Sequence, residues 1–224
     1  MPSASIERIG IDESGKGDYF GPLVVAAVFV SSTTEPELAL MQVRDSKKVS
    51  DGRVLEMAPD IKTICPHSVI AIGPQKYNEL YVKIRNLNRL LAWGHAKALE
   101  NLLERVTCER AISDQFGDER LIIRALQEKG RRITLEQRTR AESDLAVAAA
   151  SILARAEFLV RLRRLSDEVG TSLPKGASPA VELAAKMIVR KHGETRLGSV
   201  AKLHFRTTAA VLRASMPSEG HPPT

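Results

Sequence analysis

Two apolar runs, residues 6–12 and 23–30, constrain the fold of this chain more than any other feature of the sequence. Each has the length of one β-strand. Residues 23–30 are apolar throughout, and the first run is apolar from Ile9 to Ile11; such continuity is typical of strands that are covered on both faces. The second run is too short to cross a bilayer. The two runs therefore predict adjacent strands of an α/β protein with helices on both sides of a central sheet.

The segment that joins these runs begins with two carboxylates, Asp12 and Glu13, and continues with a loop that contains three glycines. Neighbouring strand residues point to opposite faces, so both carboxylates can serve one site only if the strand ends or bends there. We expect the glycine-rich loop to allow this, because glycine adopts unusual backbone angles and lets a ligand approach closely. An acidic pair beside a bare loop that carries Lys16 suits a metal ion and a phosphate; a solvated hairpin turn is the alternative.

Patterning along the rest of the chain predicts further strands at 68–72, 110–113 and 132–136 and helices at 76–106, 121–129, 141–165 and 181–192. Trp93 is assigned to the core-facing side of the long helix 76–106. Residues 44–52 and 173–178 are predicted loops, with Ser46 and Ser50 as candidate helix N-caps. With no repeat and no linker inside the chain, we predict one domain over 1–215 and a disordered tail over 216–224.

Charge and cysteine content bound the function. The net charge is +6, and residues 120–164 account for it with eleven Lys or Arg against five Asp or Glu. Such a basic segment is typical of a surface that binds a polyanion, although a solvated helix surface is the common alternative. Cys65 and Cys108 form no metal-binding pattern, and the first residues do not resemble a signal peptide. These features favour a cytoplasmic protein with no membrane association, which we expect to be a monomer.

Carboxylates at strand ends and at a helix start carry the predicted chemistry: Asp12 with Glu13, Asp114 and Glu142. Ligands of open α/β sheets gather outside strand ends, and clustered carboxylates repel one another unless a cation lies among them. All-oxygen ligands suit Mg²⁺ or Mn²⁺ and argue against zinc. Two such ions beside a basic surface indicate hydrolysis of a phosphodiester. The alternative for Glu142 is a simple charge effect at a helix N-terminus.

Seven consecutive motifs between about Ile9 and Phe205 resemble those of the type 2 ribonucleases H, and specifically ribonuclease HIII. They are IDESGKGDYFGP, DSKKVSD, NLNRLLAWGHAKAL, SDQF, TRAESDLAVAAASILAR, LPKGAS and AKLHF. The resemblance implies an RNase H-like fold, with a mixed central sheet flanked by helices and with C-terminal helices. It also implies an endonuclease that cleaves the RNA strand of an RNA/DNA hybrid with two divalent ions and leaves 5′-phosphate and 3′-hydroxyl ends.

The resemblance also implies roles for particular residues. The four acids that would hold the metal ions and act in catalysis fall on Asp12, Glu13, Asp114 and Glu142, with Asp144 as an alternative to the last. Main-chain groups of Gly15, Lys16 and Gly17 would meet the 2′-hydroxyls that distinguish RNA from DNA. The predicted substrate-binding set is completed by Ser46, Lys47, Lys48 and Ser151. Lys202, His204 and Phe205 are expected to close the core and contact the backbone.

The chain departs from the related pattern in two respects. Ribonuclease HII relatives usually carry an arginine between the loop glycines and a tyrosine after the last catalytic helix, whereas this chain has Lys16 and the segment LPKGAS. This difference favours continuous hybrid tracts over single embedded ribonucleotides, which are the HII-like alternative. Typical ribonuclease HIII proteins also have a small substrate-binding domain before the catalytic one, and here the first strand begins almost at Met1. We expect the basic segment 120–164 to compensate in part.

Overall fold

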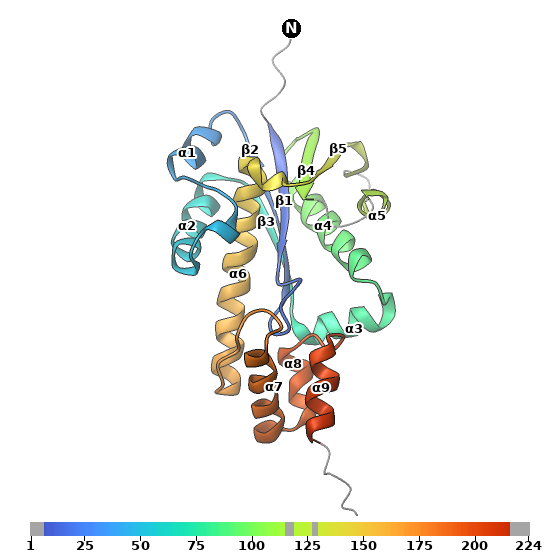
Figure 1. The fold of residues 1–224 in the computed structure, drawn as a ribbon. Coiled ribbons are helices and arrows are strands. Elements are labelled where there is room, and N and C mark those ends of the chain that lie inside the picture. Colours follow the sequence, from blue (N-terminus) through green and yellow to red (C-terminus); the bar gives the residue numbers. More distant parts are fainter. Residues whose placement is uncertain (1–6, 115–118, 127–129, 216–224) are drawn as a thin grey trace, which may run out of the picture.

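A mixed sheet of five strands forms the centre of the protein in a computed structural model that describes residues 7–114, 119–126 and 130–215 (Figure 1). The strands are β1 (Arg8–Ser14), β2 (Leu23–Val30), β3 (His67–Ile72), β4 (Arg110–Asp114) and β5 (Thr134–Arg138). They lie in the order β3-β2-β1-β4-β5. The hairpin strands β1 and β2 are antiparallel, as are β2 and β3, whereas β4 runs parallel to both β1 and β5.

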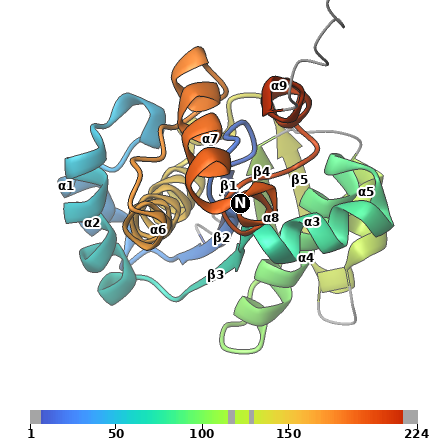
Figure 2. The same ribbon diagram turned by 90° about the horizontal axis from the view of Figure 1, so that it is seen from below.

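Helices cover both faces of the sheet. The α-helices are α1 (Glu35–Leu40), α2 (Asp51–Ile64), α3 (Pro74–Ile84), α4 (Leu87–Leu103), α5 (Glu119–Ala125), α6 (Leu145–Val169), α7 (Pro179–His192), α8 (Glu194–Val200) and α9 (Arg206–Ser215). Short 3₁₀ turns are η1 (Ser46–Lys48), η2 (Gly130–Arg132) and η3 (Ala141–Ser143). In Figures 1 and 2, α6 lies along one face with α1 and α2 beside it, and α4 and α5 lie on the other face. The C-terminal helices α7–α9 gather at the end of the sheet where the β1–β2 loop lies.

The alternation of side chains along β2 shows why this strand is apolar throughout. Val24, Ala26 and Val28 pack into the core on the α6 side, whereas Val25 and Ala27 pack into the core on the α4 side. All five are fully buried. The predicted sheet with two covered faces is therefore confirmed, since each successive side chain enters an apolar layer.

The small residues of α6 allow this helix to lie directly against β1. A Cβ atom built on Gly10 would lie 2.0 Å from the carbonyl carbon of Ala146 and 2.2 Å from the backbone nitrogen of Val147. The two backbones therefore touch where β1 has no side chain. This close approach places the start of α6 beside the strand that carries Asp12 and Glu13.

The predicted helix over 76–106 is wrong as a single element, because α3 and α4 are separate helices. Arg85 ends α3 in the left-handed conformation with φ 50°, and the side chain of Asn86 caps α4 by accepting from the backbone N–H of Arg89 at 3.1 Å. The apolar periodicity continues across the break, so periodicity alone does not reveal it. The core assignment of Trp93 is also wrong, since its side chain is 43% exposed.

The helix predicted over 141–165 starts later and ends later. Residues 141–143 form η3, Asp144 caps α6 by accepting from the backbone N–H of Ala146 at 2.8 Å, and Gly170 ends the helix at φ 57°. The other boundaries differ by a few residues, as in β5, which begins two residues after its predicted start. Residues 115–118, 127–129 and the predicted tail 216–224 lie outside the described residues. No helix in the described ranges is long and apolar enough to cross a membrane.

Candidate active site

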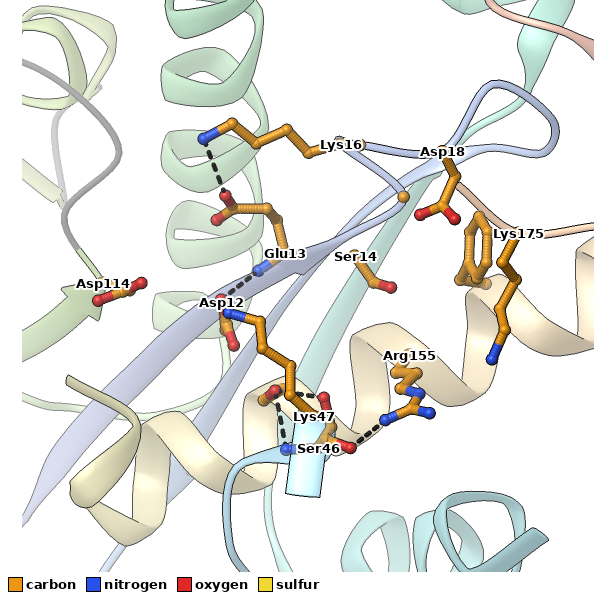
Figure 3. A pocket seen from close by; sticks show the side chains of 14 residues that line it. Asp12, Glu13, Ser14, Lys16, Asp18, Ser46, Lys47, Asp114, Arg155 and Lys175 are labelled. Carbon is orange, nitrogen blue, oxygen red and sulfur yellow. Dashed lines mark hydrogen bonds and ion pairs between the residues drawn. The ribbon is translucent and has the colours of Figure 1, made fainter. Parts of the chain in front are cut away.

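A cavity of about 550 Å³ opens where β1 and β4 part (Figure 3). The last paired residues of these two strands are Ile11 and Ser113, and Asp12 and Asp114 follow them directly. Asp12, Glu13 and Asp114 therefore come together, as predicted, at one opening of the sheet. The residues that line the cavity are Asp12, Glu13, Ser14, Gly15, Lys16, Gly17, Asp18, Ser46, Lys47, Asp114, Ser151, Arg155, Phe158 and Lys175.

The expected end or bend of the strand at the acidic pair is wrong. Strand β1 continues to Ser14 and stays paired with β2, so Asp12 and Glu13 point to opposite faces of the sheet. In Figure 3, Asp12 points toward α6 and η1, and Glu13 points toward α4. Both reach the cavity because the ladder between β1 and β4 has stopped beside them. Side chains on both faces of β1 therefore reach one site because β4 no longer pairs beside them, and not because β1 bends.

Asp12 lies in a strongly desolvated part of the site. One of its carboxylate oxygens accepts from the backbone N–H of Glu13 at 2.8 Å, and Ser151 on α6 also forms a hydrogen bond with the carboxylate. Burial, followed by the negative charge of Glu13, raises the pKa of Asp12 to about 7, against the opposing effect of these hydrogen bonds and of Lys47. A cation bound here would stabilise the ionised carboxylate of Asp12.

Both carboxylate oxygens of Glu13 have a cationic or N–H neighbour. Nε2 of the buried His95 donates to Oε2 at 3.0 Å, and Nζ of Lys16 lies 3.7 Å from Oε1. Burial alone would raise the pKa of Glu13, but the hydrogen bond and charge of His95, with Lys16 and Lys47, outweigh burial and hold the pKa below its ordinary value. Glu13 therefore presents an ionised carboxylate to the cavity.

Asp114 completes the group of acids at the opening. The backbone N–H of Ala141 in η3 lies 3.4 Å from its Oδ1, so the turn before α6 is directed at this carboxylate. The acids supply oxygen ligands only, which is the chemistry that Mg²⁺ and Mn²⁺ prefer. As they stand, no three acidic, histidine or cysteine side chains of the described part of the chain converge closely enough to hold a metal ion.

The segment that contains η1 is fixed to α6 by polar contacts. Ser46 is buried, and its hydroxyl lies 2.7 Å from the hydroxyl of Ser151. The guanidinium of Arg155, one turn further along α6, donates to the backbone carbonyls of Ser46 and Val49. Ser46 is not the N-cap that was predicted, because Asp45 accepts from the backbone N–H of Lys47 at 3.0 Å. The predicted cap at Ser50 is confirmed.

The loop after β1 presents bare backbone to the cavity. Gly15 has a φ of 87°, and a Cβ atom there would lie 2.2 Å from the carbonyl oxygen of Pro22, so the fold itself requires glycine. Gly17 is different, since a Cβ atom at this position would meet nothing within 4 Å. Gly17 is also exposed and lines the cavity. The fold does not explain glycine at this position, whereas close approach of a ligand would.

Comparison with known proteins identifies the family of this site. The sequence model for ribonuclease HII matches residues 9–208. The chain belongs to the ribonuclease HII family. Ribonuclease HIII of Protochlamydia amoebophila is 49% identical over 92% of this chain and 68% of its own length, and that of Chlamydia pneumoniae is 45% identical over 89% and 68%.

Solved structures of family members have the same fold. The crystal structure of Bst RNase HIII in complex with Mn²⁺ matches with a TM-score of 0.88 at 37% identity, and covers 95% of this chain and 71% of that one. The RNase HII of the PCNA complex from Archaeoglobus fulgidus matches with a TM-score of 0.72 at 29% identity over 90% and 96%. The predicted RNase H-like fold is confirmed, and the chain is a ribonuclease H enzyme with endonuclease activity of the RNase H type.

The two candidates for the fourth acid of this ribonuclease H site, Glu142 and Asp144, differ in the contacts that their side chains make. Asp144 caps α6 and forms an ion pair with Arg8, whose Nε lies 2.6 Å from its Oδ2. Glu142 lies in η3 next to Ala141, which contacts Asp114, although its own side chain does not line the cavity. Because Asp144 is already engaged by structural partners, we propose Glu142 as the fourth acid.

This assignment gives a direct test. We expect Glu142→Gln to lose most of the cleavage activity while its thermal unfolding stays close to that of the parent protein. Asp144→Asn weakens the pairing with the buried Arg8, so we expect it to lower the free energy of unfolding by about 2 kcal/mol. Melting curves and cleavage rates of the two variants check this pair of outcomes, and the reverse pattern would make Asp144 the fourth acid.

The other predicted substrate-binding residues fall into two groups. Ser46, Lys47 and Ser151 line the cavity together with the glycine loop, whereas Lys48 is exposed and does not line it. Much of the charge in the segment 120–164 is also paired within the protein. Arginines of this segment form ion pairs with Glu136, Asp51, Glu157 and Glu168. The segment therefore offers a polyanion less free charge than its composition suggests.

Several residues of the site were not identified from the sequence. His95, Arg155 and Lys175 all contact or line the site, and each acts through a partner that is distant in sequence. The sequence carried one signal for His95, because a histidine four residues from both Leu91 and Leu99 lies on the buried face of α4. Arg155 follows Ser151 by one helical turn, but nothing local indicates its contact with the Ser46 segment.

Lys202 supports the glycine loop from below and confirms the expected backbone contact. Its side chain is fully buried, and Nζ donates to the carbonyl oxygens of Asp18 at 2.7 Å and Gly21 at 2.8 Å. Burial lowers the pKa of Lys202 to about 7, against the opposing charge of Asp18. His204, the next polar residue of the motif, stacks on Tyr81 with ring centroids 4.3 Å apart.

Replacing Lys202 by Met is expected to destabilise the protein. The apolar side chain fits the same space but leaves buried carbonyl oxygens without a donor, which costs about 2–4 kcal/mol in the free energy of unfolding. Chemical denaturation measures this difference. Lys62→Met is the matched control, because Lys62 is exposed on α2 and we expect a change of about 0.5 kcal/mol or less. Equal stability of the two variants would contradict the supporting role.

Proposed function

We propose that the chain hydrolyses the RNA strand of RNA/DNA hybrids as an endonuclease and leaves 5′-phosphate and 3′-hydroxyl ends. One observation carries this proposal: a single cavity combines the carboxylates of Asp12, Glu13 and Asp114 with a glycine backbone and with several cationic side chains. Acids that bind a divalent cation, N–H groups that bind a phosphate and backbone that approaches a sugar are the components that phosphodiester hydrolysis of RNA needs. The free thiols of Cys65 and Cys108 fit the cytosol as its location.

The four acids have the following proposed roles. Asp12, Glu13, Asp114 and Glu142 hold two Mg²⁺ or Mn²⁺ ions, and the raised pKa of Asp12 supports a cation at this position. Ions bound in this way supply an activated water and stabilise the leaving oxygen. Glu13 is ionised and oriented by His95 before any ligand arrives. The family membership and the Mn²⁺ complex of the Bst relative support the metal requirement.

The loop 15–17 is proposed to contact the sugar of the substrate, and the lysine side chains beside it are proposed to bind the phosphates of the nucleic acid. Gly17 is exposed at the cavity without a conformational need for glycine, so its main chain is open to a 2′-hydroxyl. Lys16 and Lys47 lie beside the acids and can contact the phosphates that flank the cut. Arg155 is engaged with the Ser46 segment and is assigned to support rather than to substrate contact.

The segment LPKGAS supports continuous hybrids over single ribonucleotides. It is fastened to the glycine loop, because the backbone N–H of Gly176 donates to Asp18 at 2.6 Å and that of Tyr19 donates to the Gly176 carbonyl at 2.9 Å. The side chain that this segment places in the cavity is Lys175. Nζ of Lys175 forms an ion pair with Asp51 at 2.5 Å, and a lysine cannot stack on a junction as a tyrosine ring would.

A cleavage assay with two labelled substrates tests the proposal. A continuous RNA/DNA hybrid is compared with a DNA duplex that contains one ribonucleotide, each with Mg²⁺, Mn²⁺ or chelator. We expect several cuts in the hybrid, no cut at the single ribonucleotide and no cleavage with chelator. Preferred cutting at the single ribonucleotide would replace the proposal by HII-like incision. Cleavage that persists in chelator would refute the metal-dependent reaction.

A further inference from the structure

A buried histidine links Glu13 to the strand end that carries Asp114. His95 on α4 has no solvent exposure, and its Nε2 donates to Oε2 of Glu13 at 3.0 Å. Its other ring nitrogen, Nδ1, lies 3.4 Å from the hydroxyl of Ser113 on β4. That hydroxyl donates to the backbone carbonyl of Asp114 at 3.0 Å. One imidazole thus contacts the ends of both strands that carry the acids.

The fold brings α4 close enough for this contact. A Cβ atom on Gly94 would lie 2.9 Å from Cγ2 of Val25, so the residue before His95 must be small for the helix to approach β2. Burying an imidazole among apolar residues is unfavourable unless its nitrogens are satisfied. Here the partners are a carboxylate and a hydroxyl that belong to the site itself. Packing alone would be served as well by an apolar residue such as the neighbouring Leu91 and Leu99.

We infer that His95 is a positioning residue for the metal ligands: it holds one oxygen of Glu13 and steadies the strand end that carries Asp114. This inference rests on the proposed function, in which both acids bind divalent cations. A hydrogen bond to Oε2 fixes the rotation of the Glu13 carboxylate, so that Oε1 faces Lys16 and the cavity. Hydrogen-bond donors that orient metal-binding groups in this way typically contribute 10- to 100-fold to metal affinity or activity.

The test compares Mn²⁺ binding by the wild type, His95→Leu and His95→Gln, measured from the electron paramagnetic resonance signal of free Mn²⁺. We expect the leucine variant to bind Mn²⁺ about 10- to 100-fold more weakly, with a lower kcat and an unchanged KM for the hybrid. Glutamine can donate to Glu13 and should restore most of the affinity. Glu100→Gln is the matched control, because Glu100 is also buried on α4 but accepts from Gly130 away from the cavity.

The outcomes separate this inference from the proposed function. If His95→Leu binds Mn²⁺ as tightly as the wild type, or if glutamine is no better than leucine, the positioning role is wrong. If Asp12→Asn leaves Mn²⁺ binding unchanged, the site assignment itself is wrong. If both His95→Leu and Glu100→Gln lower the melting temperature and neither selectively changes the Mn²⁺ affinity, the effect is a general loss of packing. That outcome would also overturn the inference.

A second surface lies on the far side of the same helix. Trp93, the only tryptophan of the chain, is 43% exposed and borders a cavity of about 600 Å³ between the end of α3, α4 and α5. Arg89 and Arg124 also line this cavity, and neither forms an ion pair with any described residue. Some other exposed arginines of the described ranges have a carboxylate partner, such as Arg161 with Glu157. The feature that marks this surface is the single tryptophan of the chain, which shares one cavity with two arginines.

We propose that this Trp93 surface contacts a segment of the hybrid duplex beyond the cleavage site. The reasoning is charge complementarity: the free guanidinium groups suit phosphates, and the indole suits the apolar face of a sugar or base. Helix α5, which contributes Arg124 to this surface, is the next described element after β4, the strand that ends at Asp114. This proposal also rests on the proposed function, but it does not depend on the metal ligands.

The single tryptophan makes the surface directly observable. With chelator present to prevent cleavage, the hybrid is titrated into the wild type while the emission of Trp93 is followed. We expect a change in emission, and we expect Arg89→Gln/Arg124→Gln to weaken binding and to lower the salt slope by about one to two. Arg190→Gln/Lys191→Gln on α7 is the charge-matched control. Constant emission with equal affinity of both double variants would overturn the surface while leaving cleavage, and thus the proposed function, intact.

Discussion

Asp12→Asn is expected to reduce the metal-dependent cleavage of an RNA/DNA hybrid by about a thousandfold, which corresponds to about 4 kcal/mol of transition-state stabilisation. The change keeps the size of the side chain but removes the charge of the acid that follows the last paired residues of β1 and β4. Single-turnover rates with saturating Mn²⁺ measure the loss. Asp60→Asn, on the exposed surface of α2, is the control that should keep the full rate.

The same variant should not lose stability, which separates a catalytic defect from a folding defect. In metal-free protein, burial and the charge of Glu13 raise the pKa of Asp12 to about 7, above its ordinary value of 3.8. Between these values the folded state holds a proton that the unfolded chain releases, so stability falls as the pH rises through this window. Asp12→Asn should abolish that fall. Cleavage at the parental rate, or an unchanged pH dependence of unfolding, would contradict the role assigned to Asp12.

Gly10→Ala is expected to have the largest effect on stability of any single methyl group added to the described part of the chain. The new Cβ would lie 2.0–2.4 Å from backbone atoms of Ala146 and Val147, so β1 and α6 would have to separate. Overpacking against backbone cannot be relieved by a change of rotamer. We expect a loss of about 3 kcal/mol or more in the free energy of unfolding and a melting temperature lower by about 10 °C.

Gly52→Ala is the matched control for this prediction. A Cβ on Gly52 would meet nothing within 4 Å, and the residue lies in the first turn of α2. We expect this variant to be as stable as the parent or up to about 1 kcal/mol more stable, because alanine restricts the unfolded chain. If both variants melt at the parental temperature, the contact between β1 and α6 is looser than the structure shows.

The cleavage rate of Gly10→Ala should fall along with its stability, because Asp12 lies two residues from Gly10 on the same strand.

The proposed function assigns specificity and chemistry to different parts of one cavity. In the proposed function, the acids at the ends of β1 and β4 serve the reaction and the loop 15–17 contacts the sugar, and LPKGAS contributes Lys175 to the same cavity. Lys202 and Arg155 hold these parts together through buried donors to backbone carbonyls. Changes at the supporting residues should therefore affect substrate choice only through the shape of the cavity.

Local sequence determined the elements and the chemistry of this protein. The apolar runs of β1 and β2 report burial on both faces, and this information lies in consecutive residues. Acids that follow the apolar stretches of β1 and β4 are placed at the end of the sheet by strand direction alone. The cap at Ser50 and the small residues of α6 are also local features, so they could be predicted without knowledge of any distant partner.

Only the tertiary structure decided which side chains meet. The ring of His95 reaches Glu13 across 82 positions, and Arg8 pairs with Asp144 across 136, and neither contact has a local signal. The break at Arg85 and the exposure of Trp93 were missed because periodicity reports an apolar face but not the partner or the place where it ends. Asp12 and Glu13 share one site although they face opposite sides, because β4 stops pairing beside them. Such an opening depends on where a neighbouring strand ends, and no stretch of β1 contains that information.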